Sequence, residues 1–152
     1  MDEHTLKRCL SKHPHTQRYF RGVFAKDEIH PPLLPNSIYI VNHSVRKMGG
    51  NHWICIWVTP ECLVCYIDPI GAPPPVCKEF ERLLEREPLY IFSQKRVQHP
   101  LSISCGKFCL LFALYLARGK SVVEARQVFG ENLAQNERIV EQKFHKEFGW
   151  IP

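Results

Sequence analysis

Apolar residues gather in short runs along this chain, and the spacing within each run predicts a mixture of strands and helices. Residues 37–42, 52–58 and 63–67 are rich in β-branched and aromatic side chains, which favours strands. The second and third runs are apolar at nearly every position, which is typical of central strands covered on both faces. Residues 89–92 predict a further central strand that continues toward Val97.

Apolar positions elsewhere recur with the spacing of a helix. Residues 105–117 are apolar on nearly all sides, which predicts a buried helix, and Gly119 suits its carboxyl cap. The other expected helices cover a segment ending near Lys12 and residues 76–87, 121–129 and 134–148. We see no repeat and no domain boundary. The pattern therefore predicts one α+β domain, residues 1–152, in which a central mixed sheet packs against the buried helix.

Length and composition are those of a soluble globular protein. The chain has 152 residues, of which 45% are hydrophobic and 23% charged, and this length can bury a sizeable core. Its longest apolar stretch, residues 108–117, is shorter than the roughly 20 residues that span a bilayer. The first residues lack the charged-then-apolar pattern of a secretory signal. We therefore expect an intracellular, soluble monomer with no membrane partner.

Seven cysteines are many for this length, but the absence of a secretory pattern disfavours a disulfide framework. Cys55, Cys65 and Cys109 lie within or beside apolar runs, where a free thiol is typically buried as a small hydrophobic side chain. The net charge of +5 and the isoelectric point near 8.9 indicate mild attraction to polyanions. The positive charges are spread out, so they do not indicate a dedicated nucleic-acid fold.

Cys105 stands at the start of the predicted buried helix. The amino end of a helix carries partial positive charge and a nearby imidazolium adds a full charge, so both lower a thiol pKa from about 8.5. His52, which opens one predicted strand, is the candidate partner that takes up the proton and returns it to a leaving amine. Asp68 follows the next strand and is the candidate acceptor for the other ring nitrogen of His52. This order of residues predicts a cysteine peptidase.

Gln98 completes the candidate site. A tetrahedral intermediate requires donors aimed at its oxyanion, and the Gln98 amide and the Cys105 backbone N–H would supply two. Gly106 leaves the approach to the Cys105 sulfur unobstructed. Each residue alone is weak evidence, because a single histidine, a pre-proline aspartate or a loop glutamine usually has a structural or solvated role. The ordered combination is much more specific than its parts.

Three segments around these residues resemble the adenovirus protease (adenain) family of cysteine peptidases, which is related to the SUMO-specific proteases. The first is the strand Ile40-Val41-Asn42, followed by the glycine loop and His-Trp pair of residues 49–53. Residues 65–71 resemble the segment that bears the acid. Residues 98–109 keep the family's spacing between the oxyanion glutamine and the nucleophile. Residues 18–22 are similar to the family's amino-terminal aromatic segment.

The resemblance implies a papain-like arrangement in which Trp53 and Gly106 border a narrow substrate slot, consistent with a preference for small glycine residues before the cut. It also implies four catalytic roles: Cys105 as nucleophile, His52 as base, Asp68 as its orienting acid, and Gln98 in the oxyanion hole. The family cleaves capsid and core precursor proteins during particle maturation, so the expected location is the virion and the host nucleus. Adenovirus members are stimulated by DNA and by a capsid-derived peptide, whereas the chemistry itself requires no cofactor or metal.

The chain departs from the adenovirus pattern in two respects that bear on its chemistry. The acid is Asp68, as in SUMO proteases, where adenovirus members typically have glutamate. The shorter side chain can serve if the two strands lie closer together. Residues 87–97 contain no cysteine, although adenovirus members carry there the one that bonds the activating peptide. We therefore expect no covalently attached peptide, while non-specific DNA binding and stimulation by DNA stay open.

Three alternatives compete with a peptidase of precursor proteins. A deubiquitinase or deSUMOylase-like isopeptidase would use the same fold on a modifier ending in Gly-Gly, but a short chain offers little surface to dock one. A structural zinc module needs four ligands, usually in two close pairs. Its candidates are Cys62, Cys65 and Cys77, the helical pair Cys105 and Cys109, and the cluster of His4, Cys9, His13 and His15. A catalytically silent binding domain is least favoured, because all four chemical positions are filled.

Overall fold

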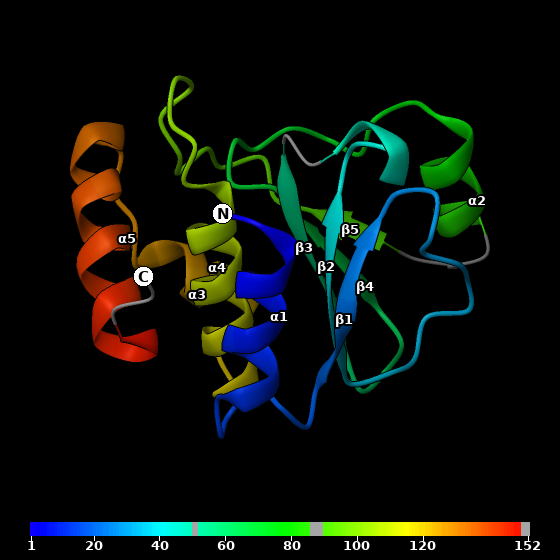
Figure 1. The fold of residues 1–152 in the computed structure, drawn as a ribbon, viewed down its shortest axis with the longest axis horizontal. Helices are drawn as coiled ribbons and strands as arrows, with labels where there is room; N and C mark the ends of the chain where they lie inside the picture. The colour runs from blue at the N-terminus through cyan, green and yellow to red at the C-terminus, as the bar shows by residue number, and fades with distance from the viewer. Residues whose placement is uncertain (50–51, 86–89, 150–152) are drawn as a thin grey trace.

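The protein is described by a computed structural model over residues 1–49, 52–85 and 90–149, and it contains one mixed sheet flanked by helices (Figure 1). The sheet has five strands in the order β1-β2-β3-β4-β5. Their bounds are β1 Phe20–Ala25, β2 Ser37–Asn42, β3 Trp53–Val58, β4 Val64–Ile67 and β5 Tyr90–Phe92. The outer pairs, β1 with β2 and β4 with β5, are parallel, whereas β2, β3 and β4 pair antiparallel.

The helices lie on both sides of this sheet. Figure 1 shows α1, α3, α4 and α5 on one side and α2 on the other. Their bounds are α1 Glu3–Lys12, α2 Lys78–Glu85, α3 Cys105–Ala117, α4 Val122–Gln127 and α5 Leu133–Phe148, with a short 3-10 turn η1 at Arg46–Met48. Helix α3 packs on β3 and is itself covered by α1, α4 and α5. The α3 bounds confirm the prediction of a buried helix, since nearly all of its residues are buried.

Two apolar clusters form the core, one on each face of the sheet. Trp53 and Cys55 of β3 join the cluster beneath α3, whereas Ile54 and Ile56 join the cluster beneath α2. Successive side chains of a strand point to opposite faces, so a strand covered on both sides must be apolar at every position. This explains the unbroken apolar run of β3 and confirms that it is a central strand. The three cysteines predicted to be buried, Cys55, Cys65 and Cys109, are 0–2% exposed.

The prediction of a central strand near residue 90 was wrong. β5 lies at an edge of the described sheet, spans Tyr90–Phe92, and leaves Tyr90 and Ile91 43% and 48% exposed. The chain leaves the sheet after β5, and the N–H of Val97 donates to the carbonyl of Pro69 at 2.9 Å. Val97 is nonetheless fully buried, so its apolar character serves packing rather than strand pairing. Leu89 lies outside the described residues.

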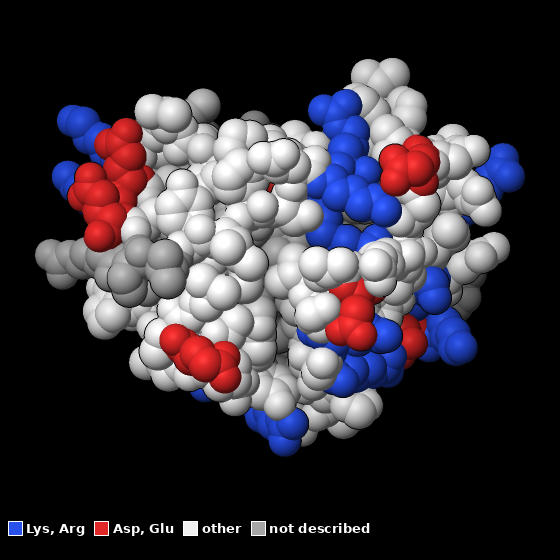
Figure 2. All heavy atoms as spheres, turned by 180° about the vertical axis from the view of Figure 1, so that it is seen from behind, with Lys and Arg blue, Asp and Glu red and all other residues white. Residues whose placement is uncertain are grey.

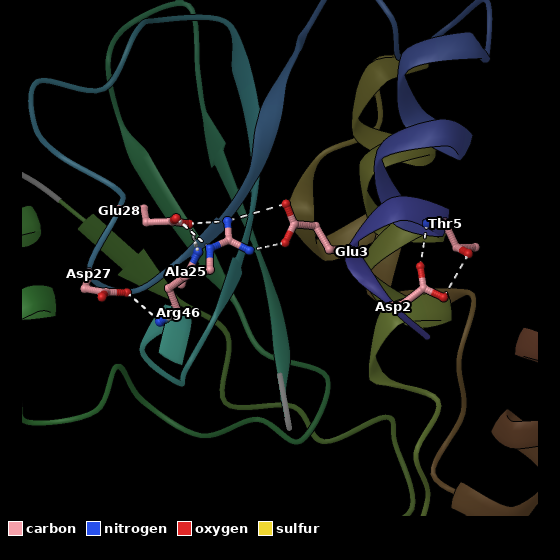
Figure 3. A network of polar contacts seen from close by, with 7 residues as sticks. All are labelled: Asp2, Glu3, Thr5, Ala25, Asp27, Glu28 and Arg46. Carbon is pink, nitrogen blue, oxygen red and sulfur yellow. Dashed lines mark hydrogen bonds and ion pairs between the residues drawn. The ribbon is translucent and has the colours of Figure 1, made fainter. Parts of the chain in front are cut away.

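The loop that precedes β3 is fixed at its base by a polar network (Figure 3). Arg46 forms ion pairs with Glu3 of α1 and Glu28 of the turn after β1. The Arg46 backbone N–H also donates to Asp27 at 2.9 Å, and Asp2 caps α1 by accepting from the Thr5 N–H. This network joins the start of α1 to the segment that leads into the glycine loop.

Charge is mixed on the surface. On the face seen in Figure 2, lysines and arginines lie beside acidic residues in most places and form no continuous basic band. Among the described residues, no helix is both long and apolar enough to cross a membrane.

Candidate active site

The sheet places His52 and Asp68 at the same end of neighbouring strands. β3 and β4 run antiparallel with Cys55 opposite Ile67, so the residue before β3 and the residue after β4 meet at one edge. His52 Nε2 lies 2.8 Å from Asp68 Oδ1, and the Asp68 side chain is fully buried. The N–H of Ile70 also donates to Asp68 Oδ1 at 2.8 Å, which fixes the carboxylate within the Asp-Pro turn. Asp68 Oδ2 is buried without a hydrogen-bond partner among the described residues.

Cys105 is the first residue of α3, and its thiol and the His52 ring shift each other's pKa. Burial raises the pKa of the Cys105 thiol. The hydrogen bond with His52, backbone hydrogen bonds from Trp53 and Gly106, and the charge of His52 lower it more, so the pKa lies below its ordinary value. Burial lowers the pKa of His52, but hydrogen bonds to Asp68 and Cys105 raise it to about 9. Because the pKa of Cys105 is lowered and the pKa of His52 is raised, the two groups favour a thiolate–imidazolium pair at neutral pH.

Gln98 is held close to the Asp68 turn by backbone contacts. The N–H groups of Val97 and Gln98 both donate to the Pro69 carbonyl, at 2.9 and 3.0 Å. Gly71 permits this approach, because a Cβ at that position would lie 2.6 Å from the Gln94 carbonyl oxygen. Gln98 is 2% exposed, and its Nε2 donates to the Ser102 carbonyl at 2.9 Å. One amide N–H is thus engaged within the loop that leads to Cys105.

The two residues predicted to border the substrate, Trp53 and Gly106, are both in contact with Met1. The Trp53 indole N–H donates to the Met1 carbonyl at 3.0 Å, and Trp53 is 7% exposed. A Cβ added to Gly106 would lie 3.0 Å from the Met1 side chain. Met1 therefore occupies the space beside both residues.

His43 is a site residue that the sequence reasoning missed, although it directly follows the Asn42 motif position. Its ring lies edge-on to His52 with centroids 4.9 Å apart, and its Nε2 shares a 2.6 Å hydrogen bond with the Tyr66 hydroxyl. Burial and the charge of His52 lower the pKa of His43 to about 4, so its ring is neutral at physiological pH. A neutral ring here supports one face of the catalytic candidate without repelling its imidazolium form.

Metal binding was the basis of one alternative. Within the described residues, the one group of three or more His, Cys, Asp and Glu side chains close enough to share an ion is His43, His52 and Asp68. Each already has a hydrogen-bond partner, and the candidate cysteine pairs join no such group. A structural zinc module therefore gains no support from the described part of the chain.

A second missed residue is Arg126, which lies in α4 and is 2% exposed. Its Nη1 donates to the backbone carbonyl of Asp68 at 3.3 Å. Nothing in the sequence pattern predicts this contact, because an arginine in a short amphipathic helix is usually solvated. Helix α4 packs on α3, and in this position Arg126 reaches the residue that follows β4.

The sequence of this chain is similar to those of several adenovirus proteases. The chain is 34% identical over 112 residues to the protease of human adenovirus A serotype 12, covering 62% of this chain and 53% of that protein. It is 33% identical over 133 residues to the protease of fowl adenovirus A serotype 1, covering 77% of this chain and 64% of the relative. The chain belongs to the adenovirus protease family. It spans about half the length of the adenovirus proteases that it matches, and no protein-family model matches it.

Solved structures give the same fold at low sequence identity. The central domain of the uncharacterized Lpg1148 protein from Legionella pneumophila is similar with a TM-score of 0.53 at 14% identity, over 97% of this chain and 95% of that one. The ASFV pS273R protease is similar with a TM-score of 0.50 at 17% identity, over 76% of this chain and 45% of its own. The α+β arrangement of a mixed sheet on a buried helix is therefore shared with a viral protease.

Proposed function

We propose that this member of the adenovirus protease family is a cysteine endopeptidase with Cys105 as nucleophile. The observation that carries the proposal is the position of Cys105 at the start of α3, where its thiol and the His52 ring shift each other's pKa, together with the 2.8 Å contact of His52 Nε2 with the buried Asp68 carboxylate. A thiolate–imidazolium pair of this kind is the state that attacks a peptide carbonyl. Sequence similarity to adenovirus proteases supports the same activity.

The proposed mechanism assigns each group to a bond that forms or breaks. The Cys105 thiolate adds to the scissile carbonyl carbon, and the negative charge moves to the carbonyl oxygen. The Cys105 backbone N–H and the Gln98 amide donate to that oxyanion. His52 then gives its proton to the leaving amine as the carbon–nitrogen bond breaks, which leaves a thioester. His52 next removes a proton from water, which attacks the thioester and releases the acid product and the thiolate.

Asp68 has an orienting role in this mechanism. It accepts from His52 Nε2, which leaves Nδ1 for the sulfur and fixes the ring orientation. The aspartate side chain is short, yet its Oδ1 lies 2.8 Å from His52 Nε2. A longer side chain is not required because β3 and β4 are direct neighbours in the sheet. This accounts for aspartate at a position where adenovirus members typically carry glutamate.

The substrates that we propose are viral capsid and core precursor proteins cut at small, glycine-containing sites during particle maturation. Relatives named as adenovirus proteases support a role in a virus or virus-like element. The proposed setting is the virion and the nucleus of the infected cell. DNA stimulation and non-specific DNA binding belong to the same proposal and are tested with it.

The test is covalent labelling with a peptide vinyl sulfone ending in Gly-Gly, measured by intact mass and peptide mapping, with and without DNA. Wild type is expected to gain one adduct, located at Cys105. Cys105→Ala should give no adduct, and His52→Ala should lower the labelling rate by at least about a hundredfold because the base is lost. Asp68→Asn should lower the rate less than His52→Ala, because an orienting residue contributes less than the base.

A matched control is Cys62→Ala, which removes an exposed thiol that is distant in sequence from Cys105 at the start of α3. It should label at the wild-type rate. Labelling spread over several cysteines and insensitive to His52→Ala would contradict the proposed function. A labelling rate that rises with DNA would identify DNA as an activator, and an unchanged rate would remove that part of the proposal.

A further inference from the structure

The loop of residues 99–104 connects the two groups that are proposed to bind the oxyanion. Gln98 precedes the loop and Cys105 follows it, and these two residues are buried, at 2% and 6% exposure. None of the loop residues, all of which the structure describes, is buried, and Leu101 and Ile103 are 89% and 87% exposed. Apolar packing therefore does not hold the loop in place, and its conformation depends on polar contacts.

Glu137 of α5 binds this loop at two points. Its Oε1 accepts from the His99 backbone N–H at 2.9 Å, and its Oε2 accepts from the Ser102 hydroxyl at 2.8 Å. The Ser102 hydroxyl oxygen also accepts from the N–H of Ser104, the amino cap of α3, at 3.0 Å. Within the described residues, Gln98 and Glu137 are the two side chains outside the loop that form hydrogen bonds with it. Glu137 thus joins α5 to both the start and the end of the loop.

The side chain of Gln98 depends on the same contact for its orientation. Gln98 Nε2 donates one hydrogen to the Ser102 carbonyl at 2.9 Å, which leaves its second hydrogen for the oxyanion. Gln98 Oε1 is buried without a hydrogen-bond partner among the described residues, so the Ser102 carbonyl is the one partner that orients the amide. Glu137 therefore holds the residue that orients the proposed oxyanion donor.

Helix α5 is a firm support for this contact, because the residue before Glu137 is itself anchored. Asn136 is 1% exposed, and its Nδ2 donates to the Val97 carbonyl at 3.0 Å. Two successive residues of α5 therefore bind the chain on either side of Gln98, at the carbonyl of Val97 and at the N–H of His99. Figure 1 shows α5 on the same side of the sheet as α3, whose first residue is the proposed nucleophile.

We propose that Glu137 is a positioning residue that holds the 99–104 loop so that the Gln98 amide and the Cys105 N–H both meet the developing oxyanion. The inference rests on the proposed function. Negative charge forms on the carbonyl oxygen as the thiolate adds, and donors stabilise it most when they are already in position. Glu137 fixes the spacing of His99 and Ser102, because one carboxylate binds both. Loss of this carboxylate frees a loop without an apolar anchor, and the Gln98 amide then loses its orientation.

The test compares two reactions of Cys105, of which one forms an oxyanion. Hydrolysis of a Gly-Gly peptide passes through a tetrahedral intermediate, whereas alkylation by iodoacetamide is a direct displacement at carbon without one. Glu137→Ala removes both contacts and should lower kcat about tenfold or more while KM stays within about twofold of wild type. Its rate of Cys105 alkylation, located by peptide mapping, should equal that of wild type.

Two further variants test the route of the effect. Glu137→Gln keeps an acceptor for the His99 N–H and offers a donor to the Ser102 hydroxyl oxygen, so its kcat should lie within about twofold of wild type. Ser102→Ala removes the hydroxyl contact from the side of the loop. In a double-mutant cycle with Glu137→Ala, the combined loss of kcat should be much smaller than the product of the two single losses.

Glu147→Ala is the matched control, because Glu147 also lies on α5 and also accepts two hydrogen bonds, both from Arg118. It lies about 15 Å further along the helix than Glu137. Both the kcat and the alkylation rate of this variant should equal those of wild type.

Two failures can be told apart. If wild type does not hydrolyse the peptide with or without DNA, the proposed function fails. If wild type hydrolyses it and Glu137→Ala keeps the wild-type kcat, or loses alkylation as strongly as it loses kcat, the Glu137 inference is overturned. Should Glu137→Ala not fold, the same comparison of kcat with alkylation is made with Ser102→Ala, which leaves α5 unchanged.

Discussion

The Cys105 and His52 side chains shift each other's protonation in opposite directions, and this predicts how activity depends on pH. The pKa of Cys105 is lowered and that of His52 is raised to about 9, so the thiolate–imidazolium pair exists between these two limits. Activity should therefore persist below pH 8.5, where an ordinary thiol is protonated, and decline above about pH 9 as His52 loses its proton. The measurement is kcat/KM for a Gly-Gly peptide across pH. A profile that rises steadily through pH 9 would mean that a free thiolate, and not the pair, carries the reaction.

Local sequence predicts some residues of the candidate site and misses others. Cys105, His52 and Asp68 were expected together because each follows or begins an apolar run whose end is marked in the sequence. Arg126 carries no such mark, and His43, although it directly follows the run of residues 37–42, was not singled out as a site residue. They are polar residues whose burial results from neighbours distant in the chain, namely Phe80 and Tyr66 for His43 and Phe112 for Arg126. Tertiary packing alone gives them a place at the site.

At the scale of elements, Gly71 controls whether the Gln98 segment can lie against the Asp68 turn. Gly71 has φ +72°, and an added Cβ would meet backbone atoms of Gln94 and Arg96 at 2.6 and 2.8 Å. Gly71→Ala should lower the free energy of unfolding by about 2 kcal/mol or more and reduce turnover by displacing Gln98. Gly119→Ala is the control, since Gly119 has φ +84° with nothing within 4 Å of its Cβ position.

Both variants place alanine at a positive φ, but only Gly71→Ala brings the new Cβ against other backbone atoms. The difference between their losses of stability therefore measures the cost of that steric contact. Gly119→Ala should cost about 1 kcal/mol and leave turnover unchanged, because its strain is confined to the end of α3. Chemical unfolding and kcat measurements give both quantities. Equal losses of stability, with normal turnover in both variants, would show that the 94–96 segment yields easily and does not set the position of Gln98.

The elements themselves were predictable to different degrees. The prediction of α3 follows from the apolar stretch of residues 108–117, which is long enough for a buried helix and apolar on nearly all sides. The prediction placed β5 at the centre of the sheet, whereas it lies at an edge. A short apolar run occurs in edge strands and in central strands alike, so only the pairing of the strands distinguishes the two positions. Residues 97 and 98 contact the Asp68 turn although they lie far from it in the sequence. The role of Gly71 in this contact therefore cannot be predicted until the segment that packs against it is known.

At the scale of the whole molecule, β3 connects two apolar clusters that could otherwise be separate cores. Its Trp53 and Cys55 belong to the cluster with α3, and Ile54 and Ile56 to the cluster with α2. Loss of order on either face therefore exposes the same strand. We expect residues 1–152 to unfold as one domain in a single transition, with equal calorimetric and van't Hoff enthalpies.

Truncations in the two clusters test this expectation. Leu111→Ala on α3 and Leu83→Ala on α2 each empty a fully buried site and should lower the free energy of unfolding by about 2–5 kcal/mol. Both should shift the same transition, whether it is followed by calorimetry or by exposure of Cys105 to alkylation. Val123→Ala, at a position 64% exposed on α4, should leave the transition in place. If Leu83→Ala instead produced an early transition that left Cys105 protected, the α2 face would be a separate unit and the active-site face would hold its geometry without it.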